Sequence, residues 1–178
     1  MKIEKDPYTA LYPNPVALIT CDDNIITIAW ISTACYDPPM LCFAMNHERY
    51  SYELIKKSGE FVVNIPKKDM IREIDICGTV SGRDVKKFKK TGLTKVMAKK
   101  IKAPIIKECP VNIECRVEKI IPLGSHDLFV GRIVSVDVDE DIMDNGEINY
   151  KKADPLCYIK GDYRAVGEIL ETAGFTKR

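Results

Sequence analysis

The residues best suited to binding an anion lie at positions 46–51, which read NHERYS. This polar segment follows an apolar run and precedes a predicted short helix. Backbone N–H groups at a helix N-terminus favour anions, and an arginine and a serine at that place suit a phosphate group. The alternative interpretation is an ordinary capped helix start with a solvated Arg49.

A second candidate lies at residues 78–88, which read GTVSGRDVKKF. Two glycines and two hydroxyl side chains precede a basic helix, so this segment suits a phosphate or a ring oxygen. A lysine-rich run is also typical of a solvated helix face. The further lysines up to position 102 allow a nucleic-acid patch, but no aromatic residues alternate with them, and residues 137–144 are acidic.

The only tryptophan introduces a third candidate at residues 30–34, which read WISTA. Small and hydroxylated residues follow Trp30 as the chain leaves an apolar run. A planar ligand can lie beside such a segment, with its edge bonded to backbone N–H and C=O groups. The alternative is a core tryptophan followed by an ordinary turn at 32–34.

Side-chain catalysis has little support in this sequence. The chain has no P-loop, GxGxxG, HExxH or GxSxG motif, and its only histidines are His47 and His126. The seven cysteines have no CxxC spacing and stand mostly in apolar runs, which is typical of small buried hydrophobes in a reducing compartment. A bound cofactor that carries the chemistry is therefore the better hypothesis, and no metal site is predicted.

The elements that would position these segments are mostly strands. Apolar and β-branched runs bounded by turn residues predict strands at 16–20, 25–30, 40–45, 61–65, 111–121, 128–138 and 156–159. Short helices are predicted at 51–57, with Ser51 as N-cap, and at 67–76 and 84–90. Because strands do not alternate with long helices, we expect a mainly β fold: a closed antiparallel barrel with short inserted helices.

Length and charge limit the functional classes. The chain has 178 residues, which predicts a single domain over 1–178. Its formal net charge is +1, so no overall field attracts nucleic acid or an anionic membrane. No apolar run reaches the roughly 18 residues of a membrane span, and the N-terminus lacks an apolar signal core. We expect a soluble, cytoplasmic protein.

Seven segments in order resemble the flavin reductase-like family, whose members form an FMN-binding split β-barrel and usually dimerise. The matching segments are PNPVALIT at 13–20, N-x5-WIS at 24–32, DPPML at 37–41, SGEFVVNI at 58–65, SGRDVKKF at 81–88, GSHDLFVG at 124–131 and PLCY at 155–158. They extend over roughly residues 12–163. One departure is Asp22-Asp23, where many relatives have a glycine in the turn.

The resemblance implies site residues for noncovalent FMN. It implies that Trp30, Ile31, Ser32, Thr33 and Ala34 line the isoalloxazine ring. The phosphate contacts would come from Arg49, Tyr50 and Ser51, and further flavin contacts from Ser81, Arg83 and Lys87. His126 would lie near the ring or the dimer interface, and Met45 and Asn46 would neighbour the pocket.

The implied activity is transfer of hydride or electrons from NADH or NADPH to flavin or another acceptor. No residue is assigned as catalytic, since hydride acceptance by flavin needs no general base. The resemblance also implies a homodimer with FMN near the interface and a small-molecule or redox-protein electron partner. Two alternatives remain: a flavoredoxin-type electron carrier without nicotinamide turnover, and a flavin-free barrel that binds a protein or nucleic acid.

Overall fold

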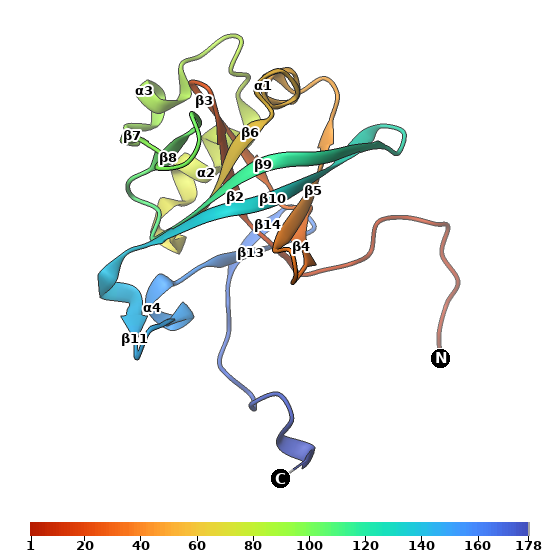
Figure 1. Cartoon of the computed structure of the whole chain (residues 1–178). Helices are drawn as coiled ribbons and strands as arrows, with labels where there is room; N and C mark the ends of the chain where they lie inside the picture. Colours follow the sequence, from red (N-terminus) through yellow and green to blue (C-terminus); the bar gives the residue numbers. More distant parts are fainter. Residues whose placement is uncertain (178) are drawn as a thin grey trace.

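Most of the apolar runs form one seven-stranded antiparallel sheet in the computed structural model, which describes residues 1–177 (Figure 1). The strand order is β3-β2-β6-β9-β10-β5-β4. The strands are β2 (Ala17–Cys21), β3 (Asn24–Ile28), β4 (Ile31–Cys35), β5 (Met40–Asn46), β6 (Glu60–Ile65), β9 (Val111–Pro122) and β10 (His126–Val138). The fold is therefore mainly β, as predicted.

Smaller sheets and short helices surround this sheet. The sheets are β1-β13-β14, β7-β8 and β11-β12, formed by β1 (Asn14–Pro15), β7 (Lys95–Met97), β8 (Pro104–Ile106), β11 (Met143–Asp144), β12 (Glu147–Ile148), β13 (Leu156–Ile159) and β14 (Asp162–Ala165). The α-helices are α1 (Tyr50–Ser58), α2 (Ile71–Thr79), α3 (Lys87–Thr91) and α4 (Tyr150–Ala153). Short 3₁₀ helices cover Lys68–Met70, Glu140–Ile142 and Phe175–Lys177. Within residues 1–177, no helix combines the length and apolarity needed to cross a membrane.

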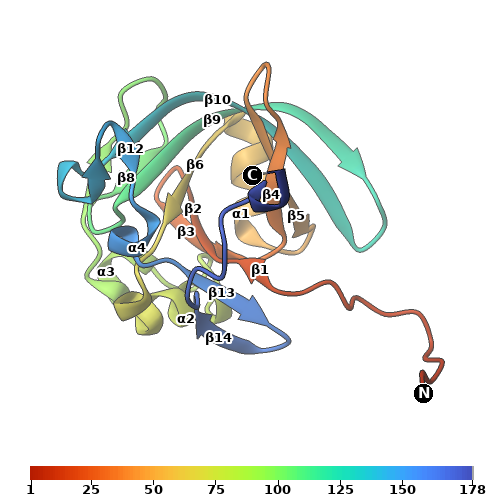
Figure 2. The same ribbon diagram turned by 90° about the horizontal axis from the view of Figure 1, so that it is seen from below.

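The expected closure of the barrel is not confirmed. The large sheet curls into an arc (Figure 2), but its edge strands β3 and β4 are not hydrogen-bonded to each other in the described residues. The chain turns between these strands at Ala29 and Trp30, and the Trp30 carbonyl accepts from Ala44 N–H at 2.9 Å. The edge of β3 that faces away from β2 is therefore left open.

Apolar side chains cover both faces of the curled sheet. The concave face buries Phe43, Phe61 and Phe129. The ring centroids of Phe61 and Phe129 each lie 5.1 Å from that of Phe43. The opposite face packs against α2 through residues that include Ile74 and Cys77. The cysteines at 21, 77, 109 and 115 are buried and unpaired, so these four occupy the hydrophobic positions that their apolar runs predict.

A buried amide joins several strands. Asn64 Nδ2 donates to the Leu18 carbonyl at 2.8 Å, and its Oδ1 accepts from Ile106 N–H at 2.9 Å and from Asn112 Nδ2 at 2.8 Å. The side chain thus ties β2, β8 and β9 to β6. Because its amide is fully satisfied, this polar group is tolerated at zero exposure.

Some predicted elements differ from the structure. The predicted helix at 67–76 is a 3₁₀ turn followed by α2, and the predicted helix at 84–90 begins only at Lys87 because residues 82–84 form a turn. The alternative turn at 32–34 is wrong: those residues belong to β4. Most of β4 is exposed, so its sequence shows no buried apolar face.

Candidate functional site

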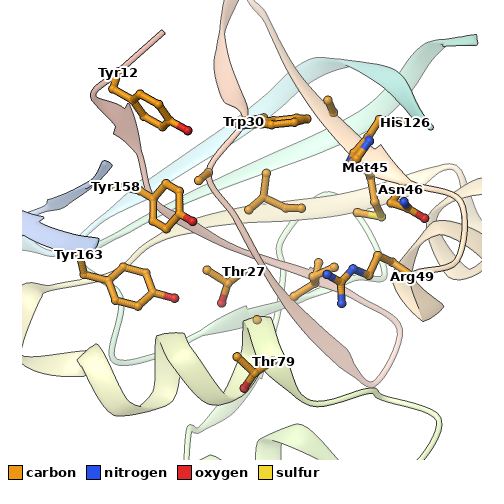
Figure 3. Close-up of a pocket in the computed structure, with 15 residues that line it drawn as sticks. Tyr12, Thr27, Trp30, Met45, Asn46, Arg49, Thr79, His126, Tyr158 and Tyr163 are labelled. Atoms are coloured by element: carbon orange, nitrogen blue, oxygen red, sulfur yellow. The ribbon is translucent and has the colours of Figure 1, made fainter. Parts of the chain in front are cut away.

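A cavity of about 330 Å³ lies at the open edge of the sheet, between β3 and the end of β5. We call it the main cavity; it is lined by Tyr12, Ile26, Thr27, Ile28, Ala29, Trp30, Ala44, Met45, Asn46, Arg49, Gly78, Thr79, His126, Tyr158 and Tyr163 (Figure 3). Because β3 is an edge strand, backbone groups on this side are free to bond a ligand. The cavity exists because the sheet does not close here.

A narrow cleft continues from the main cavity and shares Ile26, Arg49 and Gly78 with it. This polar cleft is further lined by Asn24, Tyr50, Ser51, Cys77, Val80, Ser81, Gly82 and Lys87. Inside it, Asn24 Nδ2 donates to Ser51 Oγ at 2.8 Å. Ser51 is therefore not the N-cap of α1, which begins at Tyr50 with Arg49 in the cap position.

Gly82 is needed for the shape of the polar cleft. A Cβ at this position would lie 2.2 Å from Asn24 Oδ1 and 2.8 Å from Tyr50 Cδ1. Asn24 is buried, so its amide has little room to move away. The close approach of the loop to Asn24 therefore requires the missing side chain.

Two cations in the polar cleft lack acidic partners. Neither Arg49 nor Lys87 forms an ion pair with a carboxylate anywhere in residues 1–177. Lys87 is only 3% exposed, and its Nζ donates to the Cys77 carbonyl at 2.7 Å. Burial lowers the pKa of Lys87, and the charge of Arg49 lowers it further. A buried ammonium without a counter-ion is costly unless an anion binds beside it.

A second wall of the main cavity is aromatic. Trp30 and His126 lie with ring centroids 4.9 Å apart, and Figure 3 shows them on the same wall of the cavity. Trp30 is 41% exposed, so the alternative of a core tryptophan is wrong. Ser125 Oγ lies 2.9 Å from His126 Nδ1 and helps to hold the imidazole. An accessible indole beside an imidazole suits a planar ligand.

Hydrogen bonds to Asp127 anchor the loop that carries Asn46 and Arg49. Asp127 lies within 2.6 Å of His47 Nε2 and accepts from the Tyr52 hydroxyl at 2.7 Å. These hydrogen bonds, that of His47 first, lower the pKa of Asp127. Asp127 follows His126 in β10. The same strand therefore positions His126 in the main cavity and anchors the loop that carries Asn46 and Arg49.

Arg83 interacts with other residues of the protein. Its guanidinium donates to Glu53 Oε1 at 2.7 Å and to the Glu48 carbonyl at 2.9 Å, and it lies over the ring of Tyr50. It lines neither the main cavity nor the polar cleft. In this position Arg83 fastens the loop with Ser81 and Gly82 to α1.

The thiols beside the site are not activated. Burial raises the pKa of Cys77 to about 11 and that of Cys21 to about 12. Both sulfurs therefore keep their protons at neutral pH and are poor nucleophiles. The site has the character of a binding pocket for an anionic, planar molecule.

The structure gathers most of the predicted residues around these two spaces. The main cavity is lined by Trp30, Met45, Asn46, Arg49 and His126, and the polar cleft by Arg49, Tyr50, Ser51, Ser81 and Lys87. Ile31 and Ser32 line a neighbouring cavity on the other side of Trp30. Thr33, Ala34 and Arg83 line none of the three, because β4 carries the first two away from the opening and Arg83 is engaged by α1.

Several residues of the site were not predicted. Asn24 is part of the motif N-x5-WIS, and this signal was available in the sequence. Thr27 and Tyr158 likewise lie inside the quoted motifs N-x5-WIS and PLCY, and Thr79 is one of the two hydroxyl side chains of the candidate segment 78–88. Tyr12 and Tyr163 have no comparable signal, because strand pairing in the β1-β13-β14 sheet brings them to the main cavity.

The comparisons with known proteins agree with this geometry. The model of the flavin reductase like domain matches residues 9–167 of the chain. The chain belongs to the flavin reductase-like family. A protein of Archaeoglobus fulgidus without an assigned function is 41% identical over 145 residues, which is 79% of this chain and 82% of that protein.

Two solved flavoredoxins have similar structures. The flavoredoxin of Desulfovibrio vulgaris (Miyazaki F) is 32% identical with a TM-score of 0.92, and the alignment covers 100% of both chains. The flavoredoxin of Methanosarcina acetivorans is also 32% identical, with a TM-score of 0.93 and coverage of 100% of this chain and 98% of the other. The family membership predicted from the sequence is thus confirmed.

Proposed function

We propose that the protein binds FMN noncovalently, with the phosphate in the polar cleft and the isoalloxazine ring in the main cavity. The observation that carries this proposal is the pair of cations, Arg49 and Lys87, without carboxylate partners in residues 1–177. A phosphate between them receives charge-assisted hydrogen bonds. Asn24, Ser51 and Ser81 add neutral polar groups in the same cleft.

The ring would extend along the open edge of β3. Backbone groups of residues 26–29 line the main cavity, while Trp30 and His126 form its aromatic wall. Edge-strand N–H and C=O groups are unpaired and match the donors and acceptors of a flavin pyrimidine. The cations of the cleft match the charge of the phosphate, and the aromatic wall of the cavity matches a planar ring.

Bound FMN supplies hydride and single-electron chemistry that the side chains of this chain do not. The protein binds the phosphate between Arg49 and Lys87, orients the ring and places His126 as a donor near it. A donor or cation at the ring favours the reduced, anionic form. We infer an oxidoreductase that accepts hydride from NADH or NADPH. The flavoredoxin-type carrier, which exchanges electrons with a protein partner only, is the second candidate because two flavoredoxins share this fold at 32% identity.

We also propose that the chain acts as one domain and forms a homodimer. Tyr8 and Leu11 in the N-terminal segment are 66% and 87% exposed, and this segment extends away from the sheet in Figure 2. Exposed apolar side chains in an extended arm are typical of an interface. Light scattering is expected to give the mass of two chains, and the mass of one chain would contradict the dimer.

An absorption spectrum tests the proposed function. The purified protein, with added FMN where needed, is expected to show flavin bands at one FMN per chain. Anaerobic addition of NADH or NADPH is expected to bleach them. Bands that resist both nicotinamides but bleach with dithionite would favour the carrier. A protein that takes up no FMN would contradict both candidates.

Gly82→Ala is expected to lower the affinity for FMN at least about tenfold. The new Cβ displaces Asn24 and closes the polar cleft, and overpacking of this kind costs about 1–3 kcal/mol. FMN fluorescence quenching measures the dissociation constant. Gly167→Ala is the matched control, because nothing lies within 4 Å of its Cβ position. Equal affinities of the two variants would refute the role of Gly82.

FMN affinity is expected to fall as the pH rises toward 10. The pKa of Lys87 lies below the ordinary 10.5 because the ammonium is buried, so its charge is lost at a lower pH than that of a solvated lysine. The phosphate of FMN loses its charged partner in the same pH range. Titrations with FMN from pH 7 to 10 measure this loss, and Lys87→Met is expected to flatten the profile. An equally steep profile in the variant would exclude Lys87 as the cause.

A further inference from the structure

Three tyrosines form one wall of the main cavity. Tyr158 of β13 and Tyr163 of β14 are cross-strand partners with ring centroids 5.9 Å apart, and Tyr12 precedes β1, the other neighbour of β13. Figure 3 shows the three phenol groups side by side with their hydroxyls directed into the cavity, across from Arg49 and His126. We call these residues the tyrosine wall.

The hydroxyls of the tyrosine wall are available to a ligand. None of the three has a hydrogen-bond partner among residues 1–177, although each side chain is half-buried. The neighbouring hydroxyls are already engaged, since Thr27 donates to the Ile74 carbonyl at 2.6 Å and Thr79 to the Asp75 carbonyl at 2.8 Å. The tyrosines are therefore the free hydroxyl donors on this side of the cavity.

The surroundings of the tyrosine wall favour an uncharged ligand. Arg49 and His126, the charged or titratable groups of the main cavity apart from the tyrosines, lie on its other side (Figure 3). A cavity of about 500 Å³ adjoins it through Tyr12 and Trp30, and none of the described residues that line that space is charged. Burial raises the pKa of Tyr163, which keeps its phenol protonated as a donor. Neutral donors beside neutral space match a carbonyl oxygen better than a phosphate or carboxylate.

We propose that the tyrosine wall binds the exocyclic carbonyl oxygen of a second planar ring, the uncharged reactant ring that lies beside the flavin. The proposal rests on the proposed function, because it places this ring next to bound FMN. The phosphate end of FMN lies at Arg49, so the wall is at the far end of the cavity and is accessible to a second molecule. A nicotinamide carboxamide and a quinone share the required chemistry.

Equilibrium binding to the oxidised, FMN-loaded protein tests this without turnover. The probes are 1,4,5,6-tetrahydro-NAD, a redox-inert nicotinamide, and menadione, a quinone; calorimetry measures their dissociation constants. Tyr163→Phe and Tyr12→Phe keep the rings and remove the hydroxyls. Each is expected to weaken binding of the responding probe about 3- to 10-fold, the loss of one neutral hydrogen bond. Tyr36→Phe, at a residue 95% exposed and outside all three spaces, is the matched control.

The FMN dissociation constant of each variant separates this proposal from the proposed function. It is expected to stay within about twofold of the wild type, and the probe that binds identifies the nicotinamide or the quinone as the reactant. Wild-type affinity of both variants for the probes would overturn the inference, as would no binding of either probe to the wild type. A parallel loss of FMN affinity would assign the wall to the flavin instead. Failure of the wild type to bind FMN would refute the proposed function itself.

Discussion

Lys87→Met is expected to weaken FMN binding about 10- to 100-fold, because hydrogen bonds to charged groups contribute roughly 1.5–3 kcal/mol each. The Nζ of Lys87 lies in the polar cleft, where a phosphate would replace the missing carboxylate partner. Methionine has a similar length and flexibility but no charge. Fluorescence quenching of FMN measures the affinity.

The same substitution is expected to leave the apoprotein as stable as the wild type. Lys87 is 3% exposed, and among residues 1–177 its ammonium is bonded only to the Cys77 carbonyl, so its desolvation opposes folding when no anion is bound. Methionine removes that cost and loses one hydrogen bond of about 1 kcal/mol. Urea unfolding of both apoproteins is expected to agree within about 1 kcal/mol.

Lys86→Met is the matched control, because Lys86 is the exposed neighbour and lines neither the main cavity nor the polar cleft. Its FMN affinity is expected to remain within a few-fold of the wild type. If Lys87→Met bound FMN normally but unfolded at much lower urea, Lys87 would be a structural residue. That result would remove the main argument for a phosphate in the cleft.

The buried strands could be predicted from sequence because a strand buried in the core consists mainly of apolar residues. Residues of β2 are buried throughout, as their apolar types predict. In β9 the residue types alternate over the first half but the burial does not, because Asn112 and Glu114 are buried as well. The exposed strands could not be predicted in this way. β14 has one half-buried residue, Tyr163, and is a strand because it pairs with β13, which is a fact of tertiary structure.

The site was predictable to the extent that its residues form local motifs. Arg49 and Ser51 are close in sequence, and so are Ser81 and Lys87, so these two motifs could be recognised before the structure placed them around the polar cleft. The role of Arg83 was not visible, because its partner Glu53 lies 30 residues earlier and is brought near only by folding. The tyrosine wall likewise depends on two strand pairings.

Closure of the barrel is the part of the expected fold that the structure does not confirm. Unpaired strand edges are a liability, so a closed barrel is the simplest arrangement. Here the edge of β3 stays open and lines the main cavity. In the proposed function, bound FMN would cover this edge and protect it from pairing with other strands.

Gly131→Ala is expected to destabilise the fold by about 1–3 kcal/mol or slightly more, the usual range for overpacking a core. A Cβ on Gly131 would lie 2.4 Å from Phe61 Cζ and 3.3 Å from Cys115 Cβ. Phe61 has no exposure and packs edge-on against Phe43, so its ring cannot turn away freely. Urea unfolding measures the loss, and Gly167→Ala, with an open Cβ position, is expected to change stability by less than about 0.5 kcal/mol.

A double-mutant cycle identifies the contact responsible. In a Phe61→Leu background the shorter side chain no longer reaches Gly131, so the added methyl group is expected to cost at least about 1 kcal/mol less than in the wild type. An equal cost in both backgrounds would show that the strain comes from the backbone of β10, whose pairing with β9 shifts register between Val130 and Gly131. A reduced cost means that Phe61 occupies the space a side chain would need, so the core of the curled sheet depends on a glycine in the inner strand β10.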